Sequence, residues 1–378
     1  MGERLRTSGR RVQNIEMANA IEALACWLAL THNGWSSDPR LRGSTKLAGK
    51  MDMSFAVVRR RGFYVTTPMR QATVQPLRAM GLVEGSGERF NAFSCTQIGN
   101  DFVKEACAGF RPYRREVVDH LFLWAAGESD KVVSHELRQA VSPLEPLPQD
   151  ARDFLRERIV QGAGDASRRR QALAWVEQVR ANPDHHVTWD VKPAVLDEAH
   201  WRDMHAGALF FAVRDAALAV LDRIEAQLAN RSDLRMSLNE PIPELVRADI
   251  EPLRQQSQAF LNNNHDPSPG NMAIAFSRDC ANPDGVRALE QLIARDGRGL
   301  RLRGRDIVPG PAFRGNQTGQ LEDVRSPEDT GAETPVARDT PLPDNISYRI
   351  RNLFRLNLDL RNELHSWLSE SAPDEVES

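Results

Sequence analysis

The sequence predicts a mainly α-helical protein with a small N-terminal domain that carries a β-hairpin, a helical domain, and a C-terminal helix after a flexible linker. Three observations predict this arrangement. Apolar residues recur at helical spacing through most of the chain, and one Gly-Ser-Gly turn at 85–87 lies between two short β-like runs. Residues 304–345 hold six prolines and many acidic residues but few large apolar side chains. The 378 residues suffice for two or three domains.

The first domain is predicted over residues 1–112. Residues 1–12 are basic and are expected to be a flexible N-terminal arm. An apolar stripe predicts a helix over 16–31, which Asn33-Gly34 ends. The elements expected next are a short helix near 44–50, a β-like run at Phe63–Val65, and a third helix over 67–80 that Thr66-Thr67-Pro68 starts.

Residues 82–95 are predicted to form a two-stranded hairpin between two helices. Gly81 frees the backbone to leave the third helix with a positive φ, and Gly85 and Gly87 allow a tight turn. Thr96 is expected to accept a hydrogen bond from a backbone N–H of the closing helix, which is predicted over 96–107. This stretch therefore predicts helix, hairpin and helix in close succession.

Residues 113–303 are predicted as a helical domain. Its helices are expected at 114–126, 132–141, 149–161, 166–181, 194–229, 238–262 and 284–296. The helix over 194–229 measures about 50 Å if unbroken, and its apolar positions indicate that it runs through the domain core. Residues 263–283 are expected to be a turn-rich connection.

The chain is predicted to end in a flexible linker, 304–345, and a C-terminal helix, 346–370. Apolar residues of this helix follow heptad spacing, with one asparagine among them. The seam residues are Ile346, Ile350, Leu353, Asn357, Leu360, Leu364 and Trp367. Two interpretations stay open: from Ile350 onward the seam binds a protein partner or a second copy, or it folds back on its own helical domain.

Composition places the chain among soluble proteins, and we expect it in the cytoplasm. Its four cysteines, Cys26, Cys95, Cys107 and Cys280, share no C-x-x-C spacing, which excludes a disulfide scaffold or a zinc finger. All four are expected to be small buried residues. No export signal is evident, and the apolar run over 205–221 is too short to span a membrane and is interrupted by two charges.

Charge is distributed unevenly between the two parts of the chain. Residues 1–115 contain 18 Lys and Arg against 9 Asp and Glu, whereas residues 116–378 contain 31 against 43. A basic N-terminal part indicates a polyanionic partner for that part. The alternatives are that the two parts attract each other, or that an arginine-rich face is simply solvated.

The motifs of several enzyme classes are absent from the sequence. It contains no phosphate-binding P-loop, no dinucleotide-binding glycine fingerprint and no G-x-S-x-G elbow. His200 and His205 are five residues apart and do not share a helix face as the metal ligands of H-E-x-x-H do. His265-Asp266 is interpreted as an exposed turn. We therefore expect a non-enzymatic protein with no catalytic residue, metal or cofactor.

The stretch "LRAMGLVEGSGERFNAFSCTQIGNDFV", residues 77–103, resembles the winged helix-turn-helix superfamily. In that family a "GLV"-type strand entry follows the third helix, a hairpin forms the wing, and an "LTxxG"-type start opens the next helix, here Cys95 to Gly99. The resemblance covers about a quarter of the chain. It implies binding of double-stranded DNA, with a helix in the major groove and the wing on the backbone. Pro76 inside the third helix departs from the pattern, because it kinks the helix or marks a later start.

Candidate DNA-binding residues lie on and around the third helix and the wing. Arginine suits phosphate and guanine, and glutamine suits adenine. Most of the arginines are expected to contact phosphate. The candidates are Arg59, Arg60, Arg61, Arg70, Gln71, Thr73, Gln75, Arg78 and Arg89.

Three further segments, "HWRDMHAGALFF", "LRLRGRDIVPG" and "YRIRNLFRLNLDL", are similar to uncharacterised bacterial proteins encoded in antiphage defence neighbourhoods. Together the observations favour a DNA-binding subunit of a defence or DNA-processing complex. The alternatives are a winged-helix adaptor between proteins, like the kleisin-like subunits of chromosome-organising complexes, or a transcriptional regulator.

Overall fold

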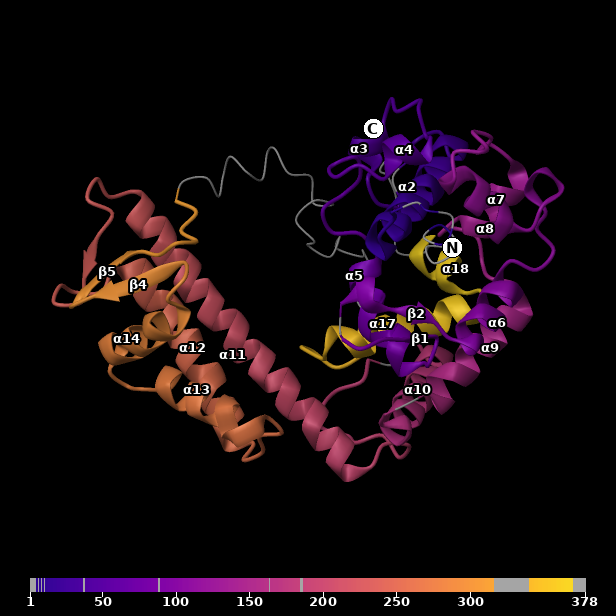
Figure 1. The fold of residues 1–378 in the computed structure, drawn as a ribbon. Coiled ribbons are helices and arrows are strands. Elements are labelled where there is room, and N and C mark those ends of the chain that lie inside the picture. The colour runs from indigo at the N-terminus through magenta and orange to yellow at the C-terminus, as the bar shows by residue number, and fades with distance from the viewer. Residues whose placement is uncertain are drawn as a thin grey trace, which may run out of the picture. The chain divides into compact units, whose positions relative to one another are not determined.

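The fold is known from a computed structural model, which describes residues 11–315 and 340–369 except Ser37, Glu88, Ala163, Asp184 and His185, together with Leu5, Thr7 and Gly9. The chain divides into two compact units (Figure 1). Of the described residues, unit 1 holds those up to 173 and from 355 onward, and unit 2 holds 174–315 and 340–354. The boundary predicted at residue 112 lies inside unit 1.

Unit 1 is built from short helices and one two-stranded antiparallel sheet. Its elements up to the hairpin are α2 (Asn14–His32), α3 (Ser44–Leu47), α4 (Phe55–Val58), α5 (Arg70–Ala79), β1 (Val83–Glu84), η1 (Phe90–Ala92) and β2 (Ser94–Cys95). After the hairpin come α6 (Gln97–Ala106), η2 (Pro112–Arg114), α7 (Val117–Ala125), α8 (His135–Val141) and α9 (Gln149–Gln161). The unit also includes the start of α10 (Ala166–Ala181), the end of α17 (Tyr348–Leu360), and α18 (Leu364–Ser369).

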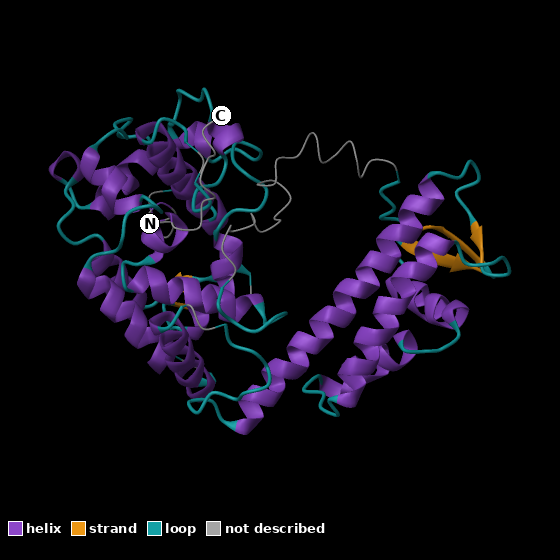
Figure 2. Cartoon of the chain, turned by 180° about the vertical axis from the view of Figure 1, so that it is seen from behind, coloured by secondary structure: helices purple, strands orange, loops and turns teal. Residues whose placement is uncertain are grey.

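Unit 2 combines helices with a three-stranded antiparallel sheet in the order β3-β5-β4. Its elements are α11 (Glu198–Ala229), β3 (Met236–Ser237), α12 (Glu244–Asn262), η3 (Pro269–Asn271), α13 (Met272–Cys280), α14 (Gly285–Asp296), β4 (Leu300–Arg303) and β5 (Asp306–Pro309). Helix α11 packs along α12, and α12 packs against α13. Figure 2 shows that helices dominate the described chain, as the sequence predicts.

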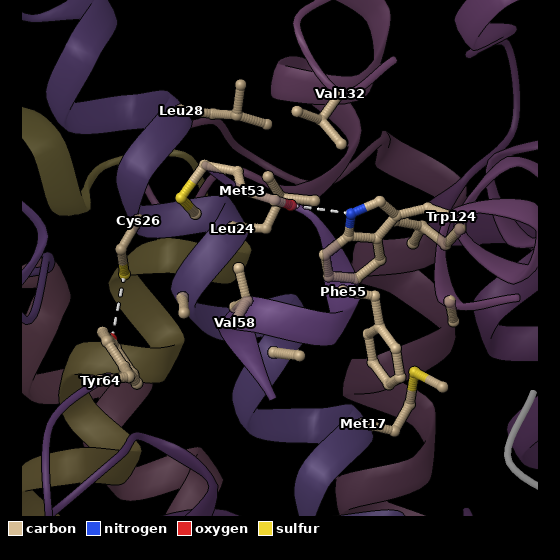
Figure 3. Packing of buried hydrophobic residues seen from close by; sticks show 14 of the residues in the cluster. Met17, Leu24, Cys26, Leu28, Met53, Phe55, Val58, Tyr64, Trp124 and Val132 are labelled. Atoms are coloured by element: carbon tan, nitrogen blue, oxygen red, sulfur yellow. Dashed lines mark hydrogen bonds between the residues drawn. The ribbon is translucent and has the colours of Figure 1, made fainter. Parts of the chain in front are cut away.

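The core of the N-terminal part of unit 1 surrounds α2. Trp124 from α7 is almost fully buried, and its indole Nε1 donates a hydrogen bond to the carbonyl of Met53 at 2.9 Å (Figure 3). The ring of Phe55 meets that indole edge-on, with centroids 5.2 Å apart. Leu5 and Val12 are buried in the same cluster. The prediction of a free N-terminal arm is therefore wrong for these two residues, and most of residues 1–10 lie outside the described part.

Several predicted elements are confirmed. Helices α9 and α10 begin and end at the predicted residues, and α2 is longer than predicted by only a few residues. Gly81 has a φ of +73° where the third helix ends. Helix α11 begins at Glu198 rather than at 194, because the side chain of Asp197 caps it by accepting from the N–H of His200.

Other predictions are wrong for identifiable reasons. Residues 63–65 form a bend and irregular chain instead of a strand, since the consecutive residues Tyr64 and Val65 are both buried in the core. Helix α12 begins only after Pro243, and the predicted connection 263–283 contains α13. The predicted linker is ordered at its start, where residues 306–309 form the central strand β5. Residues 316–339 of that linker lie outside the described part.

The C-terminal helix is two helices, α17 and α18, because the chain turns at Asn362 with a φ of +60°. The predicted seam is covered by the protein's own atoms: Ile350, Asn357, Leu360 and Trp367 are buried, and Leu353 and Leu364 are half-buried. Phe354 and Leu358, outside the seam, are also buried. This burial is what the fold-back interpretation expects.

Candidate nucleic-acid interface

Helix α5 presents a polar stripe to the surface. Gln71, Gln75 and Arg78 are spaced i, i+4 and i+7, so they share one helix face, and all three are exposed. The stripe extends over about 10 Å of helix. Thr73 is exposed but its hydroxyl donates to the carbonyl of Arg70 at 2.9 Å. The helix runs continuously through Pro76, so it does not begin there.

The N-terminus of α5 is capped from α2. The carboxylate of Glu22 accepts hydrogen bonds from the backbone N–H groups of Met69 at 2.7 Å and Arg70 at 3.4 Å. The hydroxyl of Tyr64 donates to the same carboxylate at 3.1 Å. It also donates to Cys26 Sγ at 3.4 Å, as Figure 3 shows. Burial raises the pKa of Glu22 in spite of these three donors. Glu22 therefore replaces the hydroxyl cap that the sequence predicts at Thr66-Thr67.

The C-terminus of α5 is held from α9. Arg158 Nε donates to the carbonyl of Met80 at 2.9 Å. At Gly162, which ends α9, an added Cβ would lie 2.1 Å from the carbonyl oxygen of Ala79, so only glycine permits this approach. The predicted N-terminal domain is thus completed by residues beyond its predicted boundary, and α5 is fixed at both ends.

The T-x-x-G spacing at residues 96–99 has a direct physical cause. The Thr96 hydroxyl accepts the N–H of Gly99 at 3.0 Å, as the sequence predicts, and donates to the carbonyl of Gly81 at 2.7 Å. An added Cβ at Gly99 would lie 2.1 Å from the carbonyl oxygen of Leu82. Thr96 and Gly99 together fasten α6 to the chain that enters the hairpin.

The hairpin itself is shorter in its strands and longer in its loop than predicted. Val83 pairs with Cys95 and Glu84 pairs with Ser94, and the rest is a loop that includes η1. Arg78 Nη1 donates to the carbonyl of Gly87 at 3.3 Å, which links α5 to the loop. Arg89 is exposed on the same loop. Cys95 is exposed as well and Cys107 is half-buried, so the prediction that all four cysteines are buried holds only for Cys26 and Cys280.

Two of the predicted DNA-binding arginines instead hold helices together. Arg59 forms an ion pair with Glu16 at 2.9 Å, which joins α4 to α2. Arg70 Nε donates to Asn19 Oδ1 at 2.5 Å, and burial lowers the pKa of its guanidinium. Sequence alone does not distinguish these arginines from their neighbours, because their partners lie on α2, far away in the chain.

Arg60 and Arg61 remain exposed beyond the end of α4. They line an open hollow of about 510 Å³ together with Lys50 from the turn after α3. The exposed cations among the predicted residues therefore fall into two groups, one at this hollow and one formed by Arg78 and Arg89 at α5 and the hairpin.

His265 and Asp266 of unit 2 have structural partners. His265 lies 2.6 Å from Asp203 Oδ1, and Asp266 accepts the N–H groups of Ser268 and Ile274, each at 2.8 Å. The prediction of an exposed turn at His265-Asp266 is wrong, because this segment is partly buried and caps the start of α13. Across the described residues, no group of three His, Cys, Asp or Glu side chains is placed to hold a metal ion.

Helix α11 is long and apolar enough to cross a membrane by length and composition, a test that core helices of soluble proteins also pass. In the structure it contributes Val213, Val220, Ile224 and other side chains to the core of unit 2. Its central residues Leu209–Ala212 are half-buried, so the helix is less enclosed there than the sequence predicts.

Comparison with known proteins identifies no family for this chain. It matches no family model, no curated protein and no solved structure.

Proposed function

We propose that this protein binds double-stranded DNA through its N-terminal part, with α2–α6 acting as a winged helix. The observation that supports this most is the exposed stripe of Gln71, Gln75 and Arg78 on a helix anchored at both ends. A rigid helix that displays hydrogen-bonding side chains along one face suits the major groove. The hairpin loop beside it carries Arg89, which suits the adjacent phosphate backbone.

The residues have distinct roles in this proposal. Gln71 and Gln75 face base edges, where an amide group pairs with adenine. Arg78 and Arg89 contact phosphates. Arg59 and Arg70 act indirectly, because they hold α4 and α5 against α2. Residues 116–378 carry an excess of acidic side chains, so electrostatic attraction to DNA is concentrated in the N-terminal part.

Replacing Arg78 and Arg89 together with glutamine is expected to weaken binding of a short blunt duplex by about 10- to 100-fold, with a similar loss for unrelated sequences. Fluorescence anisotropy with labelled duplexes measures the affinity. The matched control replaces Arg247 and Arg287 of unit 2, which are exposed and paired within their own helices. Equal affinities for wild type and the Arg78/Arg89 variant, or equal losses in the control, would reject the proposal.

The protein's cellular setting is proposed from its cysteines and from the resemblance of three segments. Its four cysteines are free, which suits a reducing cytoplasm. The segments that resemble antiphage defence proteins include α11 and α17, and they support a role as a non-enzymatic subunit of such a complex.

A further inference from the structure

The open hollow in unit 1 combines positive charge with a partly exposed apolar wall. It lies between the turn after α3 and the turn after α4. Its lining includes Lys50, Met51, Val57, Arg60, Arg61 and Phe63. The DNA contacts proposed for α5 and the hairpin do not involve this hollow.

Three cations, Lys50, Arg60 and Arg61, line the hollow, and its one carboxylate, Asp52, accepts a backbone hydrogen bond. Arg60 Nε donates to the carbonyl of Ala56 at 3.2 Å, which fixes the direction of its guanidinium. Lys50 Nζ lies 5.3 Å from the centre of the Phe63 ring. Asp52 accepts the N–H of Ser54 at 2.9 Å, at the start of α4. The positive charge in excess suits a phosphate group.

A site that binds only phosphate groups does not need an apolar wall. Met51 is 88% exposed, and Phe63, on the same lining, is half-buried and packs against the core cluster. Duplex DNA offers phosphates but hides the faces of its bases, whereas an unpaired nucleotide offers a phosphate and an apolar base face together. Proteins that bind single strands use this combination of cations and apolar or aromatic side chains.

Both turns that border the hollow have defined geometry. Trp27 Nε1 donates to the carbonyl of Lys50 at 3.0 Å, which ties the first turn to α2. Gly49 and Gly62 have φ values of +69° and +82°, which glycine adopts readily. Lys50, Arg60 and Arg61 therefore lie on or next to turns with a defined backbone conformation.

We propose that this hollow binds an unpaired nucleotide of DNA, with its phosphate on Lys50, Arg60 and Arg61 and its base against Met51 and Phe63. The protein then prefers a duplex that has a single-stranded overhang. This inference rests on the proposed function only in taking DNA as the ligand, because it involves neither α5 nor the hairpin.

The test compares three labelled probes by anisotropy: a blunt duplex, the same duplex with a thymine overhang, and the thymine strand alone. Wild type is expected to bind the overhang duplex about 10-fold more tightly than the blunt one. Met51→Ser and Arg61→Gln are expected to remove most of this advantage and to leave blunt-duplex affinity within about two-fold. Met272→Ser, an exposed methionine of unit 2, is the matched control and should keep the advantage.

The outcomes separate this inference from the proposed function. If the wild-type protein does not bind the blunt duplex but binds the single strand tightly, the proposed function is rejected and the inference about the hollow is supported. An overhang that adds no affinity, or an advantage that survives both substitutions, overturns the inference. Equal competition by an acidic peptide of the same charge overturns it too, because the apolar wall would then have no role.

Discussion

Replacing Gly99 with alanine is expected to lower the free energy of unfolding by about 3 kcal/mol. In an unconstrained helix the same substitution is expected to stabilise by about 0.5–1 kcal/mol, because alanine loses less backbone entropy on folding than glycine. The opposite sign is expected here because the new Cβ would lie 2.1 Å from the carbonyl oxygen of Leu82, and a backbone atom cannot move aside cheaply. This clash is relieved only if α6 moves away from the hairpin.

Urea unfolding followed by circular dichroism and tryptophan fluorescence measures this effect. Gly207 in the middle of α11 and Gly87 in the hairpin loop are the matched controls, because an added Cβ meets nothing within 4 Å at either. Gly207→Ala is expected to stabilise by about 0.5–1 kcal/mol, and Gly87→Ala to have little effect. A Gly99→Ala protein as stable as Gly207→Ala would show that α6 does not approach Leu82 so closely.

Replacing Glu22 with alanine is expected to cost about 2–3 kcal/mol, since it leaves the backbone N–H groups of Met69 and Arg70 without their acceptor and removes one acceptor of the Tyr64 hydroxyl. Glu22→Gln keeps an amide oxygen in place and is expected to cost much less. Both variants are compared with wild type by urea unfolding at neutral pH. Equal losses in the two variants would indicate that the hydrogen bonds of Glu22 do not anchor α5.

The stability difference between wild type and Glu22→Gln is also expected to depend on pH. Burial raises the pKa of Glu22, so the folded protein binds this proton more tightly than the unfolded chain does. The stabilisation is then fully present below the unfolded pKa near 4.5 and is lost as pH rises through the higher folded pKa. Wild type should therefore lose stability relative to Glu22→Gln across this range. A relative gain would mean that the three donors outweigh burial.

Elements with local signals are the ones that sequence predicts well. Helices α9 and α10 follow from apolar periodicity, and the start of α6 follows from the hydroxyl of Thr96 three residues before Gly99. Helix α13 is missed because turn-forming residues immediately precede it. Strand β3 is missed because it is two residues long and pairs with β5, so that Met236 lies opposite Ile307. Such a pairing leaves no pattern in a short window of sequence.

The candidate site is predictable in outline but not in its detail. Composition identifies a basic N-terminal part, and a short motif locates the hairpin and the helix before it. Which arginines are exposed depends on partners elsewhere in the chain: Arg59 meets Glu16, whereas Arg61, two residues later, is exposed. The caps of α5 come from Glu22 and Arg158, on either side of it in sequence and distant from it. Tertiary contacts of this kind are decided by the fold, and local spacing does not reveal them.

The central claim is that exposed arginines of the N-terminal part neutralise DNA phosphates, and the salt dependence of duplex affinity tests it most directly. With Arg78 and Arg89 as the contacts to a blunt duplex, the logarithm of the association constant should fall with the logarithm of salt concentration with a slope of about −2. In the Arg78→Gln, Arg89→Gln protein the slope should decrease in magnitude by about 2. A flat response in wild type, or the same slope in both proteins, would contradict the account.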